Sequence, residues 1–563
     1  MPGWRPAGGC GSAAAPIWSW GRTRPPEGAT FKLLDWSNCS GAFDAIILPE
    51  RGQWSTNNLY VDGTIASLPY TLPADYRLYT WTNALGGSYM SGGNWAPYGP
   101  PGTNDTARLA TATVSPIFLS HPRLTNHTLQ VTGNAVALDL NGRSLPLLNF
   151  YSGTTYANWG LVCGPGSRLA ITNSGPQAAI GTLGATLAAS ANLFIDGQAE
   201  LEVAGPATRL TGAHLRIHEG RLDIRGGAQA VFGSDPARST VTLNGSDTLA
   251  QTPLMTIDGA DSLFNGVVLW VNNGAIVVTN GGALKTLRAL NLGLEGGTRG
   301  GIVFSGAATT ASQLWGITLR NGYCRIENGA LLEAQPTIGS GAGGTGELVV
   351  TGAGSVLNGS YLEICRTRIV PEYPGARGTM VVADGGLANI SYVLMQTNGL
   401  IRLDQGLISA TFVGYDNRCL MQGGRLEGVG TFRNSGSGDR WFENSAGVIA
   451  PGLPGGALEL AGWHYLVNRP QGVIEFQIAG DGPGDHGRLL LTQSAMQLDG
   501  GTLRIILADG YRPARRATFQ LFDWSGGGSL SGAFDAVELP ARGNWLLDNL
   551  YIDGSVTLLP DTG

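Results

Sequence analysis

The sequence VAGPATRLTGAHLRI, from Val203 to Ile217, recurs twice almost in register. Ile257–Val271 reads IDGADSLFNGVVLWV, and Val350–Ile364 reads VTGAGSVLNGSYLEI. Each copy has a β-branched residue, a glycine two positions later, a small polar patch, a second glycine and a Leu-x-Ile/Val strand signal. Such short strands cannot bury their apolar face alone and must stack on the next copy. The repeat therefore predicts an all-β solenoid.

Strand signals that end in paired glycines follow two of these copies. Gly220–Ala228 reads GRLDIRGGA, and Gly274–Ala283 reads GAIVVTNGGA. Glycine supplies the positive φ that tight corners require, and Asn beside it tolerates the same conformation. Around the first copy, period-2 alternation places four apolar side chains on one face of their strands: Leu215, Ile217, Leu222 and Ile224. We therefore expect short strands with one buried face, separated by glycine corners.

The composition fits many short buried strands and excludes several other classes. Of the 563 residues, 87 are Gly, 43% are hydrophobic and 13% are charged, which is too apolar for disorder, and the glycines lack the period of collagen. The net charge is −6 and no Lys/Arg cluster forms a basic face, so we expect no nucleic acid partner. No run of 18 apolar residues occurs, so the sequence predicts no transmembrane segment.

The cysteines are scattered and form no C-x-x-C pair, which disfavours a zinc or redox site. We expect most of them to be small buried apolar residues, and their spacing defines no pairing. The six are Cys10, Cys39, Cys163, Cys324, Cys365 and Cys419.

A segment near the start returns near the end. ATFKLLDWS (Ala29–Ser37) and NLYVDG (Asn58–Gly63) recur as ATFQLFDWS (Ala517–Ser525) and NLYIDG (Asn549–Gly554). The duplication indicates tandem modules, and no secretory signal precedes the first copy, so we expect the chain to begin inside a longer natural protein. The predicted parts are an irregular N-terminal segment (1–28), the tail fragment of a preceding module (29–70), a β-helix body (78–446) and a β-rich C-terminal end or cap (447–560).

Three segments resemble a known family. They are GGNWAPYGPPGTNDTARLA (Gly92–Ala110), GVIAPGLPGGALELAG (Gly447–Gly462) and GRLLLTQSAMQLDGGTLRI (Gly487–Ile505). Their order is similar to that in autotransporter-like passenger β-helices of large exported bacterial surface proteins. The resemblance implies a right-handed parallel β-helix, export, and an extracellular or cell-surface location. It implies no catalytic residues, because the motifs shared by the family are structural.

Two motifs could bind a metal, and each has a simpler explanation. His214 and His218 are four residues apart, which would place both on one face of a helix, but the LRI between them has strand period. DGPGDHG (Asp481–Gly487) could offer oxygens to Ca²⁺, but it lacks the repeating nonapeptide of calcium β-rolls. An outer strand position and an exposed turn are favoured, so no metal or cofactor is expected.

LPDTG (Leu559–Gly563) matches a sortase recognition pattern. The matching place in the first tail copy reads SLPYT, so the Leu-Pro belongs to the end of a module. We therefore favour a structural role for this sequence over cell-wall sorting.

Carboxylate pairs and aromatic residues are the remaining candidates. Enzymes that cleave polysaccharides need paired carboxylates in a groove, and two pairs that are close in this sequence are Asp258/Asp261 and Glu219/Asp223. A solvated strand face or an Asp-Gly turn explains both pairs better. Aromatic side chains could stack on sugars, and three that fall on strand signals could face either way: Trp270, Trp315 and Tyr361.

The sequence leaves three hypotheses open. The first is a non-catalytic exported surface protein, a structural or adhesive β-helix rod on the order of 100 Å long. The alternative is a polysaccharide-binding or polysaccharide-cleaving β-helix enzyme, and a third idea is self-assembly through the solenoid ends. Surface glycans and other cell-surface proteins are the expected partners, and no catalytic residue is assigned.

Overall fold

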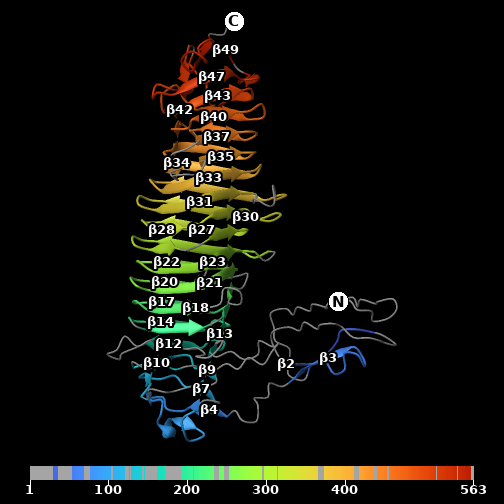
Figure 1. Cartoon of the computed structure of the whole chain (residues 1–563), viewed down its shortest axis with the longest axis vertical. Helices are drawn as coiled ribbons and strands as arrows, with labels where there is room; N and C mark the ends of the chain where they lie inside the picture. The colour runs from blue at the N-terminus through green and yellow to red at the C-terminus, as the bar shows by residue number, and fades with distance from the viewer. Residues whose placement is uncertain are drawn as a thin grey trace.

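The computed structural model confirms an all-β protein and shows a long, mostly parallel stack of strands (Figure 1). One sheet contains 44 of the strands, and its strands lie one above another from β4 (Leu78–Trp81) to the C-terminal end. The structure describes residues 29–35, 53–68, 77–102, 105–120, 126, 128–141, 145, 147, 161–172, 192–206, 208–212, 214–233, 240–245, 253–294, 297–312, 315–365, 373–410, 417–436, 440–452, 455–514, 516–541 and 543–559. The predicted irregular segment 1–28 lies outside these residues.

Parallel pairing arranges the strands in three columns, and one pass of the chain through the columns is called a rung. Column 1 contains β8 (Ile117–Phe118), β10 (Val136–Asp139), β12 (Arg168–Thr172), β14 (Glu200–Ala204), β17 (Arg221–Arg225), β20 (Pro253–Asp258), β22 (Gly274–Thr279), β24 (Gly300–Ser305), β27 (Asn321–Glu327), β30 (Thr345–Thr351), β32 (Arg377–Ala383), β34 (Gly399–Ala410), β36 (Arg425–Asn434), β38 (Val448–Pro451), β41 (Val473–Ile478), β44 (Thr502–Leu507) and β48 (Ala536–Glu538).

Columns 2 and 3 follow column 1 within a rung. Column 2 contains β15 (Arg209–Gly212), β18 (Gln229–Phe232), β25 (Thr310–Ser312), β28 (Leu331–Glu333), β39 (Gly456–Ala461), β42 (Gly487–Thr492), β46 (Phe522–Asp523) and parts of the long strands β21, β23, β31, β33, β34 and β36. Column 3 contains β7 (Thr106–Leu109), β9 (Thr128–Val131), β11 (Leu161–Cys163), β13 (Asn192–Asp196), β16 (His214–His218), β19 (Val241–Asn244), β21 (Leu263–Asn272), β23 (Ala283–Leu292), β26 (Gly316–Leu319), β29 (Pro336–Ile338), β31 (Val356–Ile364), β33 (Leu387–Met395), β35 (Asn417–Met421), β37 (Arg440–Asn444), β40 (Tyr465–Asn468), β43 (Ala495–Asp499) and β47 (Ser529–Ala533).

The parallel register places similar side chains above one another in successive rungs, and the inward ones form a continuous apolar core. The four residues predicted to share a face, Leu215, Ile217, Leu222 and Ile224, are all buried. The four described cysteines are buried as well, as expected for small apolar residues. Cys324 pairs in register with Ile302 on one side and Leu348 on the other, so it occupies one place in a row of aliphatic side chains.

A buried hydroxyl closes the turn between columns 1 and 2 in every second rung from Thr208 to Ser355. Ser262 Oγ donates to the carbonyl oxygen of Asp258 at 2.7 Å and accepts the Gly227 N–H of the preceding rung at 3.0 Å. Thr309 makes the same two contacts, donating to Ser305 at 2.9 Å and accepting from Gly281 at 3.0 Å. The small polar patch of the repeat therefore links consecutive rungs.

The intervening rungs place a small residue where the hydroxyl would be. Ala228 stacks before Ser262 and Gly282 stacks after it, as their backbone hydrogen bonds to neighbouring rungs show. Gly282 has no room for a β-carbon, because one built there would lie 2.5 Å from the Ile257 carbonyl oxygen. The repeat in the sequence is thus a pair of rungs, one with a hydroxyl and one without.

Aromatic residues cover the N-terminal end of the stack. There β4 pairs in parallel with β7 and antiparallel with β6 (Trp95–Ala96), while β5 (Gly87–Ser88) pairs with β8, and the 3₁₀ helix η1 spans Gly92–Asn94. Trp95 packs edge-on against Trp81 at 5.1 Å and Tyr89 at 4.9 Å between ring centroids. Its indole N–H donates to the Tyr89 carbonyl at 2.7 Å. These rings bury apolar surface that the first rung would otherwise expose.

The duplicated tail forms the same small antiparallel sheet in both copies. In the first copy β1 (Thr30–Lys32) and β2 (Gln53–Ser55) flank β3 (Thr64–Leu68). In the second copy β45 (Thr518–Gln520) and β49 (Asn544–Leu546) flank β50 (Ser555–Leu559). Strands after residue 447 continue the parallel stack as far as β48, and the antiparallel sheet closes its C-terminal end.

The hydroxyl turn makes a prediction about stability. Substitution Ser262→Ala leaves a buried amide and a buried carbonyl without this partner, which should cost about 1–3 kcal/mol. Ser262→Thr should be close to neutral, because Thr fills the equivalent place at Thr309. Urea unfolding of both variants and hydrogen exchange at the Gly227 amide measure the effect. Equal stability of the alanine and threonine variants would contradict the assignment.

Candidate functional site

The two histidines weighed as metal ligands lie far apart along one strand. His214 and His218 both belong to β16, and four residues of extended chain separate them by about 13 Å. His218 Nδ1 lies 2.9 Å from Asp196 Oδ1, while His214 Nδ1 accepts the Thr240 N–H at 3.2 Å. Their partners are different, and the described part of the chain contains no cluster of three His, Cys, Asp or Glu that could hold a metal.

The DGPGDHG loop uses its oxygens internally. Asp485 accepts the Gly482 N–H at 3.2 Å, and Asp481 accepts the Tyr511 hydroxyl. His486 is buried edge-on against Phe519, and its Nδ1 donates to the Gly482 carbonyl at 3.0 Å. The geometry is that of a folded turn anchored by a buried imidazole.

The predicted carboxylate pairs have other partners. Asp258 accepts hydrogen bonds from Thr279 at 2.8 Å and Asn280 at 2.7 Å, and Asp261 lies exposed in the following turn with φ of 63°. Asp223 is paired with the neighbouring Arg221 at 2.7 Å. Glu219 is a corner residue with φ of 59° and bridges Asp196 through its backbone.

Of the LPDTG motif, only Leu559 lies among the described residues, as the end of β50. The aromatic residues that could face either way all point outward. Trp315 is 78% exposed and Trp270 36% exposed. Tyr361 is half-buried on the outer side of β31, since Leu362 beside it is buried. No helix in the described residues has the length and apolar character needed to cross a bilayer.

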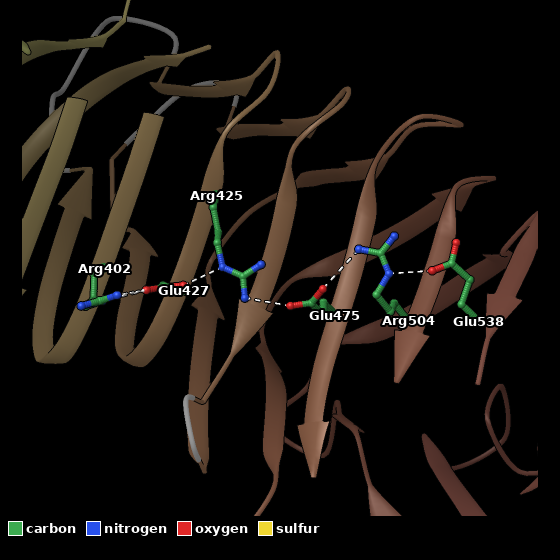
Figure 2. Close-up of polar contacts among 6 residues, drawn as sticks. All are labelled: Arg402, Arg425, Glu427, Glu475, Arg504 and Glu538. Atoms are coloured by element: carbon green, nitrogen blue, oxygen red, sulfur yellow. Dashed lines mark hydrogen bonds and ion pairs between the residues drawn. The ribbon is translucent and has the colours of Figure 1, made fainter. Parts of the chain in front are cut away.

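A chain of alternating Arg and Glu side chains runs across six C-terminal strands of column 1 (Figure 2). Glu427 accepts Arg402 at 2.7 Å and Arg425 at 2.6 Å. Arg425 reaches Glu475 at 2.8 Å. Arg504 then joins Glu475 at 3.2 Å to Glu538 at 2.6 Å, which completes what we call the ion-pair ladder.

Register explains why the ladder forms. Arg402 pairs directly with Glu427, and Glu475 pairs directly with Arg504. The strand between them places the small Ala450 at this position, and Arg425 bridges across it. Burial alone would lower the pKa of Arg425, but hydrogen bonds to both glutamates raise it on balance. These carboxylates are committed to arginines, which makes them poor acid or base catalysts.

A groove on the outer side of column 3 is a better candidate site. Its lining encloses about 370 Å³ and consists of Arg418, Leu420, Gln422, Trp441, Glu443 and Ser445. One side consists of Arg418 and Trp441. In register, these two residues belong to a longer outward row that continues beyond the groove: Tyr361, Tyr392, Arg418, Trp441 and Tyr465. Leu420 and Glu443 form the floor, and Gln422 and Ser445 form the other side, because they follow at two-residue intervals along the same strands.

Glu443 is the centre of the groove's polar contacts. Ser445 donates to it at 2.8 Å, the Trp441 indole N–H at 3.2 Å, and Arg469 lies 3.4 Å away. Burial alone would raise the pKa of Glu443, but these three donors hold it below its usual range. Arg469 also binds Asp499 at 2.8 Å. Glu443 is therefore an ionised acceptor beside an aromatic surface.

Neither the ladder nor the groove was found from the sequence. Alternation could have placed Trp441 and Glu443 outward, because Phe442 and Asn444 between and beside them are buried. It could not show that Tyr465 stacks on Trp441, with ring centroids 5.0 Å apart, because that needs the register of successive rungs.

Two further hollows in the described residues contain one carboxylate each. One lies near Arg433 and Glu459, and Glu459 accepts the Thr431 hydroxyl at 2.9 Å. The other contains Glu538, which the ladder uses. The groove likewise has only Glu443 in its lining. Glycoside cleavage usually needs two carboxylates facing each other across the substrate, and none of these three hollows supplies them.

Comparison with models of known protein families gives no match, and no curated protein sequence matches the chain. The class that the geometry defines is a solenoid-like, parallel all-β protein with ladders of stacked side chains.

The ion-pair ladder predicts that a Glu→Gln substitution lowers stability more at Glu427 than at Glu538. The Glu427 side chain is 6% exposed and bonds two arginines, whereas that of Glu538 is 54% exposed at the end. Glu427→Gln should cost about 2–3 kcal/mol and Glu538→Gln less than about 1 kcal/mol. Chemical denaturation of the two variants at low and high salt measures this difference. Equal losses would show that the ladder is only a surface feature.

His486 predicts a loss of stability at acidic pH. Burial lowers its pKa below the ordinary value and outweighs the hydrogen bonds to the backbone, so the folded state disfavours the imidazolium. Its contribution to stability is full above the unfolded pKa of about 6.5 and is lost as pH falls through the folded pKa. The melting temperature between pH 7.5 and 5 should therefore fall less in His486→Gln than in the parent. His464→Gln, at an exposed position, should retain the parent slope.

Proposed function

We propose that the three columns close into a right-handed parallel β-helix. Three observations support closure: each column is continuous over many rungs, the chain passes through the columns in a fixed order, and the apolar side chains of all three belong to one core. The proposed hand follows from the strong preference of parallel crossover connections for right-handedness.

We infer that the protein is a non-catalytic exported surface protein, a structural or adhesive stalk. The observation that carries this proposal is that the buried and half-buried polar side chains bond to neighbouring rungs of the stack. Buried hydroxyls link consecutive rungs, and the buried Glu427 and the partly buried Glu475 bond arginines. At about 4.8 Å per rung, column 3 alone extends for roughly 80 Å. The resemblance of the chain to autotransporter-like passengers supports the extracellular or cell-surface location.

The alternative function is recognition of polysaccharides, and the groove beside Trp441 favours it. Binding without cleavage fits this groove better than catalysis, because Glu443 is the single carboxylate in its lining. Surface glycans and other cell-surface proteins remain the proposed partners of the stalk.

Protease accessibility on intact cells tests the surface location. Cells that make the protein should lose it to added protease without lysis, while an internal marker protein survives. Incubation of the purified chain with neutral and acidic polysaccharides should release no reducing ends or unsaturated products. Protection from protease would contradict the surface location, and turnover of any polymer would contradict the non-catalytic role.

A further inference from the structure

We propose that the groove beside Trp441 binds one extended, ribbon-like chain of neutral hexopyranose units that lies along the stack. The inference rests on the proposed adhesive function and names the ligand class and the residues. It assigns the outward row Tyr361–Tyr392–Arg418–Trp441–Tyr465 as the stacking side of the site. Glu443 in the groove floor, and Gln422 and Ser445 on the other side of the groove, supply the polar contacts.

The aromatic side has the spacing that a straight chain of rings requires. Trp441 and Tyr465 lie 5.0 Å apart between centroids and are tilted by 32°. Tyr361 and Tyr392 lie 5.3 Å apart and are tilted by 46°. The row advances by one strand per rung, about 4.8 Å, so its two aromatic pairs, one on each side of Arg418, together span about 20 Å. Pyranose rings expose C–H faces that pack on aromatic rings, whose edges and faces favour such contacts.

The row is accessible although its rings contact one another. Tyr465 is 47% exposed, and Tyr361, Tyr392 and Trp441 are half-buried on the outer side. Buried aromatic residues in the same strands, such as Phe442, point to the core instead. Packing of the core does not require four aromatic residues on the outside, so ligand contact explains them better.

The floor offers an acceptor of the kind that sugar hydroxyls need. A carboxylate has about four lone-pair positions, and Glu443 uses three of them for Ser445, Trp441 and Arg469. One position remains for a hydroxyl of a chain that stacks on Trp441. Gln422, on the other side of the groove, accepts the Gln396 amide at 3.0 Å, so a second polar side chain lines the groove.

Charge favours a neutral chain over an acidic one. The two arginines near the groove, Arg418 and Arg469, are balanced by Glu443 and Asp499. A uronic acid chain would bring its carboxylates against an ionised Glu443 in a partly desolvated hollow, which is unfavourable. A neutral chain avoids this repulsion and can use Glu443 as an acceptor.

Affinity electrophoresis with the full chain tests the proposal. The gels contain glucomannan, xyloglucan or galactomannan as neutral ribbon-like probes, and alginate or polygalacturonate as acidic probes. At least one neutral polymer should retard the parent protein, and the acidic polymers should not. Absence of retardation by all three neutral polymers, or retardation by acidic polymers alone, would overturn the proposal.

Matched variants locate the site. Trp441→Ala and Tyr465→Ala should each weaken binding by about tenfold, since a stacked aromatic contributes about 1.4 kcal/mol. Trp315→Ala removes an exposed Trp outside the groove and should bind as the parent does. Glu443→Gln retains an acceptor and should weaken neutral binding only a few-fold. Equal binding by Trp441→Ala and the parent, with unchanged melting temperatures, would place any binding elsewhere.

The outcomes separate this inference from the proposed function. A surface-located, inactive protein that binds no neutral polymer would remain a stalk but would lack this site. A protein that binds as expected but is internal to the cell would have the site without the proposed location. Cleavage of a bound polymer would overturn the non-catalytic role and leave the binding residues in place.

Discussion

Parallel hydrogen bonding between consecutive rungs is the constraint on which the rest of the structure depends. It fixes which residue lies above which, because a slip by one residue would turn every side chain to the opposite face. The apolar rows, the buried hydroxyls and the ion-pair ladder all follow from that register. Each buried hydroxyl or ion pair contributes a modest free energy of folding by itself. Its polar atoms would also lose their partners in any rung that paired out of register, which disfavours that pairing. The stack is therefore specified as well as stabilised by its side chains.

Much of this architecture could be predicted from the sequence. The recurrence that begins at Val203, Ile257 and Val350 gave the stacked strands, and alternation in LRIHEGRLDIRGG gave the buried face. Cysteine burial also followed from composition and spacing, as Cys324 shows. These successes share a cause: they depend on periodicity within one or two strands, which a chain displays locally. The closed coil, its hand and the surface location stay predictions.

The site could not be predicted in the same way, because its residues come from rungs separated by insertions of variable length. Arg425 meets Glu475 across 50 residues of sequence, and the small Ala450 occupies the place between them. Trp441 and Tyr465 show no special spacing until the strands are paired. The sequence instead drew attention to local pairs such as His214/His218, whose residues lie apart because a strand extends them. On a stack of rungs, the residues of a site come from different strands, whereas a sequence motif contains residues of a single strand or turn.

The same stacking rule produces opposite results on two faces of the molecule. On column 1, charged residues of opposite sign lie in neighbouring strands, so the carboxylates are paired with arginines. On column 3, aromatic residues lie in adjacent strands beside a groove whose lining has Glu443 as its one carboxylate, so an ionised acceptor remains there. A rod built in this way acquires a binding surface by the choice of outward residues, with no change to its core. The aromatic residues of column 3 contact one another in cross-strand pairs, which stabilises the stack, and their outward surface is the part of column 3 that a ligand could contact.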